Sequence, residues 1–438
     1  MTKRTNLIFS IDTIDKFKVN LLAWSQEYKK VVWLDSNTKN NLNNNPIQSD
    51  FDAVLAVDSF SEISSDYTNS FSKLKEFQKK TKDYIFGYLG YDLKNDVEKL
   101  NSNNFDGLKF PDVFFFQPKK MFFIKGNILE VRYLEQFESE IESDVLEIKN
   151  YKLSSRNSNS SDLKIKLRIH KDDYYSKINK VLAHILRGNI YEVSFCQEFF
   201  AENSTIDPIK VYQNLNKISS PPFATFLKAD DKFLLSASPE RFIKRTGNTV
   251  ISQPIKGTIK RGENSSEDKE LIFQLENDSK ERAENIMIVD LVRNDLSKTA
   301  NKDSVKVTEL CKVYTFEQVH QLISTIESKV ETETNSIDII KSLFPMGSMT
   351  GAPKIAAMQI IEELEETKRG LYSGAVGYFS PTGDFDFNVI IRSILYNETE
   401  RYISYSVGGA ITAKSVPEKE YEECLLKAKA MRDVLLNS

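Results

Sequence analysis

A lysine between a proline and a glycine is a setting suited to chemistry. Lys256 lies in the run PIKGT at 254–258, directly after a β-rich run at 249–253. We therefore expect Lys256 where a strand leaves a sheet and meets a turn. Gly257 lets a ligand approach the backbone closely, and the amides of Gly257 and Thr258 are then free to bind an anion. For this pentapeptide alone, the alternative is a solvated surface lysine in a turn.

Two pairs of glutamates have a spacing that places both members of a pair on one helix face. Glu281 and Glu284 lie in one predicted helix, and Glu420 and Glu423 lie in another near the chain's end. Positions three apart share a face. Mg²⁺ is usually held by few carboxylates, with water and an anionic substrate completing its ligands. A single pair is most often a solvated face, but Glu284 precedes the apolar run 286–292, and carboxylates beside buried surface need a cation.

Glycine-flanked turns indicate an anion site. The run GSMTGAPK at 347–354 is expected to open a helix at Pro353, and a helix start preceded by glycine binds anions readily. Gly408 and Gly409 inside a predicted strand imply close approach of a ligand or a neighbouring backbone. Together with the carboxylate pairs, these turns indicate a polyanionic small molecule bridged to a metal.

Hydrophobic patterning predicts the helices that position these residues. One helix is expected over 170–187, with an apolar face and Gly188 as its stop. A helical stretch over 267–296 is expected to break near 277–279, where Asp278 or Ser279 could cap the second segment. Further helices are expected at 337–343, 354–368 and 418–436.

Strand-like runs alternate with these helices without βαβ regularity. They are expected at 31–34, 53–57, 84–92, 113–116, 121–124, 190–200, 224–228, 232–237, 241–244, 373–379, 387–396 and 402–412. The residues 117–120 are read as a tight connection, and Gly408-Gly409 as an interruption of the last strand. Residues 37–45 are expected to form a loop, and 137–162 a linker or mobile loop. The pattern predicts an α+β fold with a large, mostly antiparallel sheet system.

Composition limits the class of protein. With 438 residues, 40% of them hydrophobic, the chain can bury a large core. A net charge of -4 gives no electrostatic argument for a nucleic-acid or membrane partner. No run reaches signal-peptide or transmembrane length, so we expect a cytoplasmic small-molecule enzyme. The three cysteines lie far apart and are expected to be small buried hydrophobes.

Eight runs of the sequence together resemble one known family. They are 188–191, 238–242, 254–258, 280–295, 344–354, 370–378, 390–392 and 417–430. The chain resembles the chorismate-utilising enzymes, which include anthranilate synthase component I, aminodeoxychorismate synthase component I, and the isochorismate and salicylate synthases. The resemblance implies the α+β anthranilate synthase component I-like fold, with large, mostly antiparallel β-sheets flanked by helices. Residues 1–150 would form its N-terminal part and 165–438 its chorismate-binding catalytic region, in one intertwined unit.

The third residue of the PIKGT run separates subclasses of the family. Aminodeoxychorismate synthases carry lysine there, whereas anthranilate synthases typically carry alanine, so Lys256 implies amino transfer to chorismate. The product would be 4-amino-4-deoxychorismate, the precursor of p-aminobenzoate and folate. Anthranilate synthase component I is the alternative, disfavoured also because no Leu-Leu-Glu-Ser stretch is obvious near the N-terminus. A catalytically silent chorismate- or tryptophan-binding subunit would need to have lost a catalytic group, and none is missing.

The resemblance implies a role for each site residue. Lys256 would attack C2 of chorismate while Glu240 donates a proton to the departing C4 hydroxyl; ammonia would then add at C4 and expel the lysine. Lys256 must then be partly neutral and Glu240 partly protonated, so desolvation or neighbouring charge must shift both pKa values. The other roles are Mg²⁺ binding by Glu284 and Glu423, supported by Glu281 and Glu420; contact with the enolpyruvyl carboxylate by Tyr372, Arg392 and Gly408; contact with the ring carboxylate by Gly257, Thr258 and Lys427; and a further substrate contact by Ser348.

Two positions depart from the family pattern. Relatives usually have histidine where this chain has Gln321, so His320 either replaces it in catalysis or is only structural. Relatives carry glutamine, or a water-activating lysine in the isochorismate and salicylate enzymes, where this chain has Glu192. The missing lysine argues against those two activities. Glu192 could accept a proton from ammonium arriving at C4, or hydrogen-bond as the glutamine would.

The source of ammonia is expected to lie outside this chain. No cysteine sits in the Gly-x-Cys-x-Gly turn of a glutaminase. The resemblance therefore implies a heterodimer with a separate glutamine amidotransferase subunit that supplies ammonia.

Overall fold

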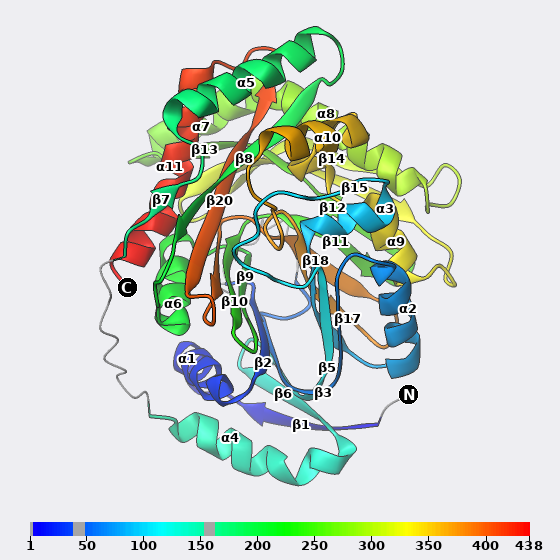
Figure 1. Ribbon diagram of the computed structural model, residues 1–438. Coiled ribbons are helices and arrows are strands. Elements are labelled where there is room, and N and C mark those ends of the chain that lie inside the picture. Colours follow the sequence, from blue (N-terminus) through cyan, green and yellow to red (C-terminus); the bar gives the residue numbers. More distant parts are fainter. Residues whose placement is uncertain (1–2, 38–48, 153–162) are drawn as a thin grey trace.

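Twenty strands join into one antiparallel sheet that folds back on itself in the computed structural model, which describes residues 3–37, 49–152 and 163–438 (Figure 1). Two arms spread from β5 (Val113–Lys125). The first arm runs in the order β3 (Ala53–Ser65), β2 (Lys30–Asp35), β9 (Phe223–Ala229), β10 (Lys232–Ser238), β19 (Ser393–Asn397), β20 (Tyr402–Thr412) and β8 (Glu192–Ala201). The second arm runs in the order β4 (Ile85–Leu89), β17 (Ala375–Phe379), β18 (Phe385–Val389), β11 (Arg241–Thr246), β12 (Thr249–Gln253) and β15 (Val319–Lys329).

Shorter or peripheral strands complete the two arms. β13 (Ile255–Lys260) and β14 (Lys306–Thr315) both pair with β15 at the end of the second arm. β7 (Lys166–Leu167) and β16 (Gly351–Ala352) pair with β8 at the end of the first. β6 (Ile128–Leu134) pairs with β5 and with β1 (Arg4–Ser10). Strands from residues 1–150 and from 165–438 therefore share hydrogen bonds in both arms.

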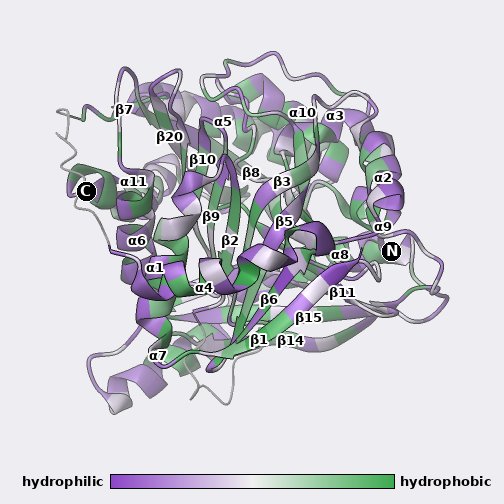
Figure 2. Cartoon of the chain, turned by 90° about the horizontal axis from the view of Figure 1, so that it is seen from below, coloured by the Kyte–Doolittle hydropathy of each residue, from purple (hydrophilic) through white to green (hydrophobic). Residues whose placement is uncertain are grey.

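The first arm is buried on both faces, which explains its continuous apolar runs. In β2, Val32 faces a core between the two arms, whereas Val31 and Trp33 face a second core beneath helices. Successive strand residues point to opposite faces, so both faces need apolar side chains. The second core is covered by α1 (Ile14–Trp24), α4 (Ile141–Asn150), α6 (Pro208–Ser219) and α11 (Pro417–Leu436). Figure 2 shows the hydrophobic colour on interior strands and both colours on the covering helices.

Of the remaining helices, the two that lie before residue 100 had no predicted range, and the others agree with their predicted ranges at most of their bounds. The remaining helices are α2 (Ser70–Thr81), α3 (Lys94–Val97), α5 (Lys171–Leu186), α7 (Ser265–Asn277), α8 (Ser279–Ser297), α9 (Ser336–Leu343) and α10 (Lys354–Leu364). The predicted break is confirmed: the Asp278 carboxylate caps α8 by accepting the backbone N–H groups of Lys280 and Glu281. α10 ends four residues before the predicted bound. Among the described residues, no helix is long and apolar enough to cross a membrane.

The predicted hairpin at 113–124 is wrong, because both runs belong to the single strand β5. Pro118, which cannot donate a backbone hydrogen bond, lies opposite Ser59 of β3, next to a register shift between Ser59 and Ser61. On its other edge β5 changes partner near the same point, from β4 to β6. A proline at a bulge can therefore remain inside a long strand.

The predicted strand at 387–396 is in fact two strands. β18 belongs to the second arm and β19 to the first, and residues 390–392 carry the chain across. Arg392 has φ 52°, which takes the backbone out of the ladder. The predicted interruption of the last strand is also wrong, because β20 continues through Gly408 and Gly409 and pairs with β8 along its length.

Part of the predicted linker is a helix. α4 lies within 137–162 and buries Ile141, Val145 and Ile148 in the second core. The loop predicted at 37–45 falls outside the described residues from 38 on, and so does the Ser- and Asn-rich part of the linker at 153–162. All three cysteines are free and buried, as expected.

Close packing of β4 on β5 leads to a stability prediction at Gly87. A Cβ on Gly87 would lie 1.9 Å from the Phe114 carbonyl oxygen, so Gly87→Ala should lower the free energy of unfolding by about 2–3 kcal/mol, the cost of overpacking. Denaturant unfolding would measure it. The control is Gly126→Ala, where φ is 57° and no atom lies within 4 Å of the new Cβ, so only about 1 kcal/mol should be lost. Equal losses would contradict the prediction.

Candidate active site

A cavity of about 550 Å³ lies where the two arms meet helices α8 and α11. Its size suits a small-molecule ligand. The second arm contributes β13, the first contributes β8 and β20, and the helices pack on these strands toward the top of Figure 1. The predicted site residues that line the cavity are Glu240, Lys256, Gly257, Thr258, Glu281, Glu284, Ser348, Tyr372, Arg392, Gly408, Glu420, Glu423 and Lys427. Of the predicted set, Glu192 and His320 do not line it.

Lys256 is part of the cavity wall and not a solvated surface residue. It lies near the start of β13, where the pairing with β15 is irregular and Gly257 has φ 91°. The lysine side chain is 14% exposed, and its Nζ donates to Glu192 Oε1 at 3.1 Å. Burial alone would lower the pKa of Lys256, but Glu192, Glu284 and Glu240 together raise it above its ordinary value. The chain without ligand therefore holds Lys256 as an ammonium.

Glu240 is a buried carboxyl group in the cavity wall. It lies in the turn that carries the chain from β10 in the first arm to β11 in the second, and it is 6% exposed. Burial raises the pKa of Glu240 to about 7, against the opposing effects of a hydrogen bond from Ser348 and the charge of Lys256. Ser348 Oγ donates to Glu240 Oε1 at 2.8 Å. Near neutral pH, a substantial fraction of Glu240 is thus a carboxylic acid that can donate a proton.

The four glutamates face the cavity from two helices, Glu281 and Glu284 from α8 and Glu420 and Glu423 from α11. Burial raises the pKa of Glu284 to about 7. Burial also raises the pKa values of Glu281 and Glu420, and the charge of Glu423 adds to both shifts. For Glu423 the effect of burial is outweighed by Lys427, 2.6 Å away, which holds its pKa below the ordinary value.

These carboxylates form a donor set that fits Mg²⁺. All offer hard oxygen atoms, and their mutual repulsion across the cavity would be relieved by a cation. Within the described part of the chain, no three His, Cys, Asp or Glu side chains stand grouped as a preformed metal site. The remaining ligands of an ion held here would have to come from water and substrate.

Groups suited to a carboxylate lie on the first arm and its crossing point. Gly408 lies in β20 where a Cβ would be 2.3 Å from the Phe195 carbonyl oxygen, so only glycine permits this approach of β20 to β8. Arg392 lies in the crossing segment and Tyr372 is 5% exposed in the wall. Lys427 Nζ donates to the Gly408 carbonyl oxygen at 3.2 Å. The planar, forked guanidinium of Arg392 beside these groups suits the binding of a planar ligand carboxylate.

The structure does not bring His320 to the cavity. Its side chain is fully buried, and its two ring nitrogens contact Thr315 Oγ1 and Asp268 Oδ1, each at 2.9 Å. Gln321 lines the cavity instead, because neighbouring strand residues point to opposite faces. This placement corresponds to the structural alternative for His320.

Comparison with known families assigns almost the whole chain. Residues 29–433 match the family described as chorismate binding enzyme. The chain belongs to this family.

Relatives and solved structures agree with this chorismate-binding fold. The anthranilate synthase component I-like protein of Synechocystis sp. is 35% identical over 79% of this chain and 71% of its own length. The aminodeoxychorismate synthase component 1 of Salmonella typhimurium is 39% identical over 60% of this chain, which spans 58% of that protein. The crystal structure of anthranilate synthase component I from Streptococcus pneumoniae has a TM-score of 0.77 at 26% identity, covering 90% of this chain and 94% of that one.

The fold alone is also shared with a solved structure of lower sequence identity. The menaquinone-specific isochorismate synthase from Escherichia coli has a TM-score of 0.76 at 17% identity, covering 99% of this chain and 95% of that one. The predicted α+β fold of large antiparallel sheets flanked by helices, like that of anthranilate synthase component I, is therefore confirmed.

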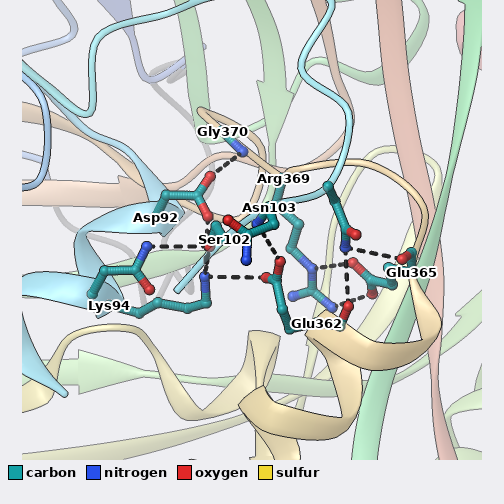
Figure 3. A network of polar contacts seen from close by, with 10 residues as sticks. Asp92, Lys94, Ser102, Asn103, Glu362, Glu365, Arg369 and Gly370 are labelled. Carbon is teal, nitrogen blue, oxygen red and sulfur yellow. Dashed lines mark hydrogen bonds and ion pairs between the residues drawn. The ribbon is translucent and has the colours of Figure 1, made fainter. Parts of the chain in front are cut away.

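Arg369, which the sequence did not mark as a site residue, supports the wall of this cavity (Figure 3). Its guanidinium binds both carboxylate oxygens of Glu365, with Nη2 to Oε1 at 2.6 Å and Nε to Oε2 at 2.9 Å. It also donates to the carbonyl oxygens of Met349 and Ser194, both cavity residues. Glu365 in turn accepts the backbone N–H of Cys196 in β8. In sequence, Glu365 and Arg369 look like an ordinary surface pair four residues apart, and nothing in their spacing reveals their burial.

A second ion-pair group in Figure 3 anchors the N-terminal region to the same segment. Asp92 accepts the backbone N–H of Gly370 at 3.0 Å, and buried Lys94 pairs with Asp92 at 3.1 Å and with Glu362 at 3.6 Å. The segment behind the cavity is thereby tied to residues far away in sequence.

Loss of the Arg369–Glu365 pair should destabilise the fold strongly. Both side chains are under 5% exposed, so Arg369→Met would leave a buried carboxylate unpaired and cost about 3–5 kcal/mol of unfolding free energy. The matched control is Lys109→Met in the exposed Lys109–Glu400 pair, also at 2.7 Å or less, where the loss should stay within about 1 kcal/mol. Denaturant unfolding would compare the two variants, and similar losses would contradict the role of burial.

Proposed function

We propose that the chain is component 1 of an aminodeoxychorismate synthase, which converts chorismate and ammonia to 4-amino-4-deoxychorismate. The observation that carries this proposal is Lys256, a mostly buried amine in the wall of the cavity, with a partly protonated acid, Glu240, in the same cavity. A lysine nucleophile paired with a proton donor suits displacement of a hydroxyl group. The Salmonella typhimurium relative carries the same name. The product would be a precursor of p-aminobenzoate and folate.

The chain's own groups divide the reaction between them. Neutral Lys256 attacks C2 of the ring, the double bonds shift, and the C4 hydroxyl leaves as water with the proton of Glu240. Ammonia then adds at C4, the double bonds shift back, and the lysine leaves C2. Ser348 keeps Glu240 oriented toward the cavity through its hydrogen bond.

Substrate placement follows from the charge distribution. Chorismate carries two carboxylates, and the proposal assigns the enolpyruvyl carboxylate to Arg392, Tyr372 and Gly408. The ring carboxylate is assigned to Lys427 and to the amides of Gly257 and Thr258. Gly257 has a positive φ and lies where the pairing of β13 with β15 is irregular, which supports a role of this turn in binding an anion.

The proposal places Mg²⁺ between α8 and α11, held by Glu284 and Glu423 with Glu281 and Glu420 beside them. Bound there, the metal would neutralise the ring carboxylate and act as a Lewis acid toward the ring. Lys280 and Lys427 pair with Glu284 and Glu423 at 3.9 and 2.6 Å in the chain alone. These two lysines balance part of the acidic charge until a cation takes it over.

Ammonia is proposed to come from a separate glutamine amidotransferase subunit. The name component 1, carried by the relative from Salmonella typhimurium, supports a partner component. Free ammonium should replace the partner in a test of the isolated chain.

Anthranilate synthase component I remains the second candidate. The relative from Synechocystis sp. and the structure from Streptococcus pneumoniae carry that description. Both candidates use the same cavity, and the product distinguishes them.

The first test identifies the product. Purified chain with chorismate, Mg²⁺ and ammonium should yield an amino product that retains the enolpyruvyl group, detected by mass spectrometry. Lys256→Ala should lower the rate on the order of 10³-fold or more, because it removes the nucleophile. Lys256→Arg keeps the positive charge beside Glu192 and should be equally impaired. Anthranilate with released pyruvate from the wild type would favour the second candidate, and full activity of Lys256→Arg would exclude a covalent role.

A second test addresses the metal through binding. Glu423→Gln should weaken Mg²⁺ binding by at least about 10-fold, because it removes a charged oxygen ligand. Isothermal titration calorimetry in the presence of chorismate would measure the affinity. The matched control is Glu422→Gln, since Glu422 is the neighbouring exposed residue of α11 and does not line the cavity. Equal affinity of both variants would contradict the metal assignment.

A further inference from the structure

Glu192 contacts Lys256 from behind the cavity wall. Glu192 is 1% exposed at the start of β8, and it does not itself line the cavity. Its Oε1 accepts a hydrogen bond from Lys256 Nζ at 3.1 Å. Its other oxygen, Oε2, is buried and has no hydrogen-bond partner among the described residues. A buried carboxylate oxygen without a partner is costly, and in this position it calls for a function.

The backbone fixes Glu192 in this place. β8 pairs with β20 on one side and with β16 on the other, and both pairings include Glu192, opposite Thr412 and Ala352. A Cβ on Gly351 would lie 2.2 Å from the Glu192 carbonyl oxygen, so β16 packs tightly against this residue. The carboxylate therefore has little freedom to move away from the lysine.

The proposed reaction needs an amine, whereas the chain holds an ammonium. Around Lys256 stand Glu192 of β8, Glu284 of α8 and Glu240 from the turn between β10 and β11, and together they favour the charged form. An ammonium has no lone pair and cannot attack carbon. A proton acceptor must therefore lie within hydrogen-bonding distance of Nζ.

Glu192 is the carboxylate that meets this requirement. Glu240 has to deliver its own proton to the leaving hydroxyl, and Glu284 belongs to the proposed metal site. Glu192 is in direct contact with Nζ, and its second oxygen has no hydrogen-bond partner among the described residues. We propose that Glu192 is the proton acceptor that converts Lys256 into the nucleophile, an inference that rests on the proposed function.

The step is an internal transfer without any outside reagent. One proton moves from Lys256 Nζ to Glu192 Oε1, which leaves a neutral amine and a neutral carboxylic acid. The lone pair of the amine then forms the bond to C2 as the C4–oxygen bond breaks. A bound substrate excludes water from the cavity, and loss of hydration favours the neutral pair over two buried charges. When ammonia later expels Lys256, Glu192 can return the proton.

The test is Glu192→Gln, which keeps the size and a hydrogen-bonding group but cannot accept the proton. In the wild type one proton is shared within the pair, so the fraction of neutral amine does not change with pH until the pair gains or loses a proton. In Glu192→Gln the lysine must lose its proton to solvent. Near pH 6, we therefore expect Glu192→Gln to consume chorismate about 10²-fold more slowly than the wild type in a single turnover. The ratio of the mutant rate to the wild-type rate should then rise about tenfold per pH unit.

The ratio of rates removes the titration of Glu240, which is common to both proteins. A second readout does not depend on turnover: pH-dependent labelling of Lys256 with an amine-specific reagent, followed by peptide mass spectrometry. Glu192→Gln should be labelled at lower pH than wild type, because the carboxylate that favours the ammonium is gone. Glu198→Gln, a second buried carboxylate of β8 that pairs with Arg168, is the matched control and should leave both readouts as in wild type.

The outcomes separate the possibilities. A rate ratio that is constant with pH, together with shifted labelling, would show that Glu192 only holds the charge, and the proposal would fail. Unchanged labelling would show that the two groups are not coupled, which also overturns it. The product assay decides the proposed function separately, because the rate of chorismate consumption is followed whichever product is formed.

Discussion

The pairing of β8 with β20 is the constraint on which the cavity depends. The two strands are in register from Ile403 opposite Ala201 to Thr412 opposite Glu192. Gly408 permits the close approach, and the side chains that alternate along β8 put Glu192, Ser194 and Cys196 on one face. A slip of one residue would turn this set to the other face and separate Glu192 from Lys256. Arg369 secures the same region by binding the backbone of Ser194 and the carboxylate that holds Cys196.

The site also depends on where the sheet crosses from one arm to the other. The chain passes from β10 to β11 through Glu240, and from β18 to β19 through Arg392. The two crossings are bonded together: Val389 N–H donates to the Glu240 carbonyl oxygen and Ala237 N–H to that of Arg392. Residues in these crossings have left the ladder, so their side chains are free to face a ligand while the backbone stays fixed. Burial shifts Glu240 toward its neutral form, and it acts in the same direction on Lys256 in β13, but there the carboxylate neighbours keep the amine charged.

Local signals predicted much of this arrangement, and the failures have physical causes. A single residue caps the start of α8, Asp278, and a single residue follows the end of α5, Gly188, so both of these helix ends were predictable from the sequence. The split of 387–396 was not, because neither glycine nor proline marks the point in this strand-like run where the partner strands change. Most of the candidate site residues were predictable from the motif resemblance, which supplies long-range information that spacing lacks. Which of His320 and Gln321 faces the cavity depends on the register of β15. Glu192 and Lys256 are 64 residues apart in sequence, so local patterns could not predict their contact.

The way in which the sheet is threaded bears on how the protein is made. β2, from the first part of the chain, lies between β3 and β9, and β4 lies between β5 and β17, so early strands must wait for partners synthesised much later. Such long-range pairing is slow to form and leaves apolar edges open meanwhile. α11, which supplies the glutamates on one side of the cavity, emerges from the ribosome after every strand it covers. The cavity can therefore assemble only after α11 has been synthesised, and until then the strands without partners expose apolar edges on which aggregation can start.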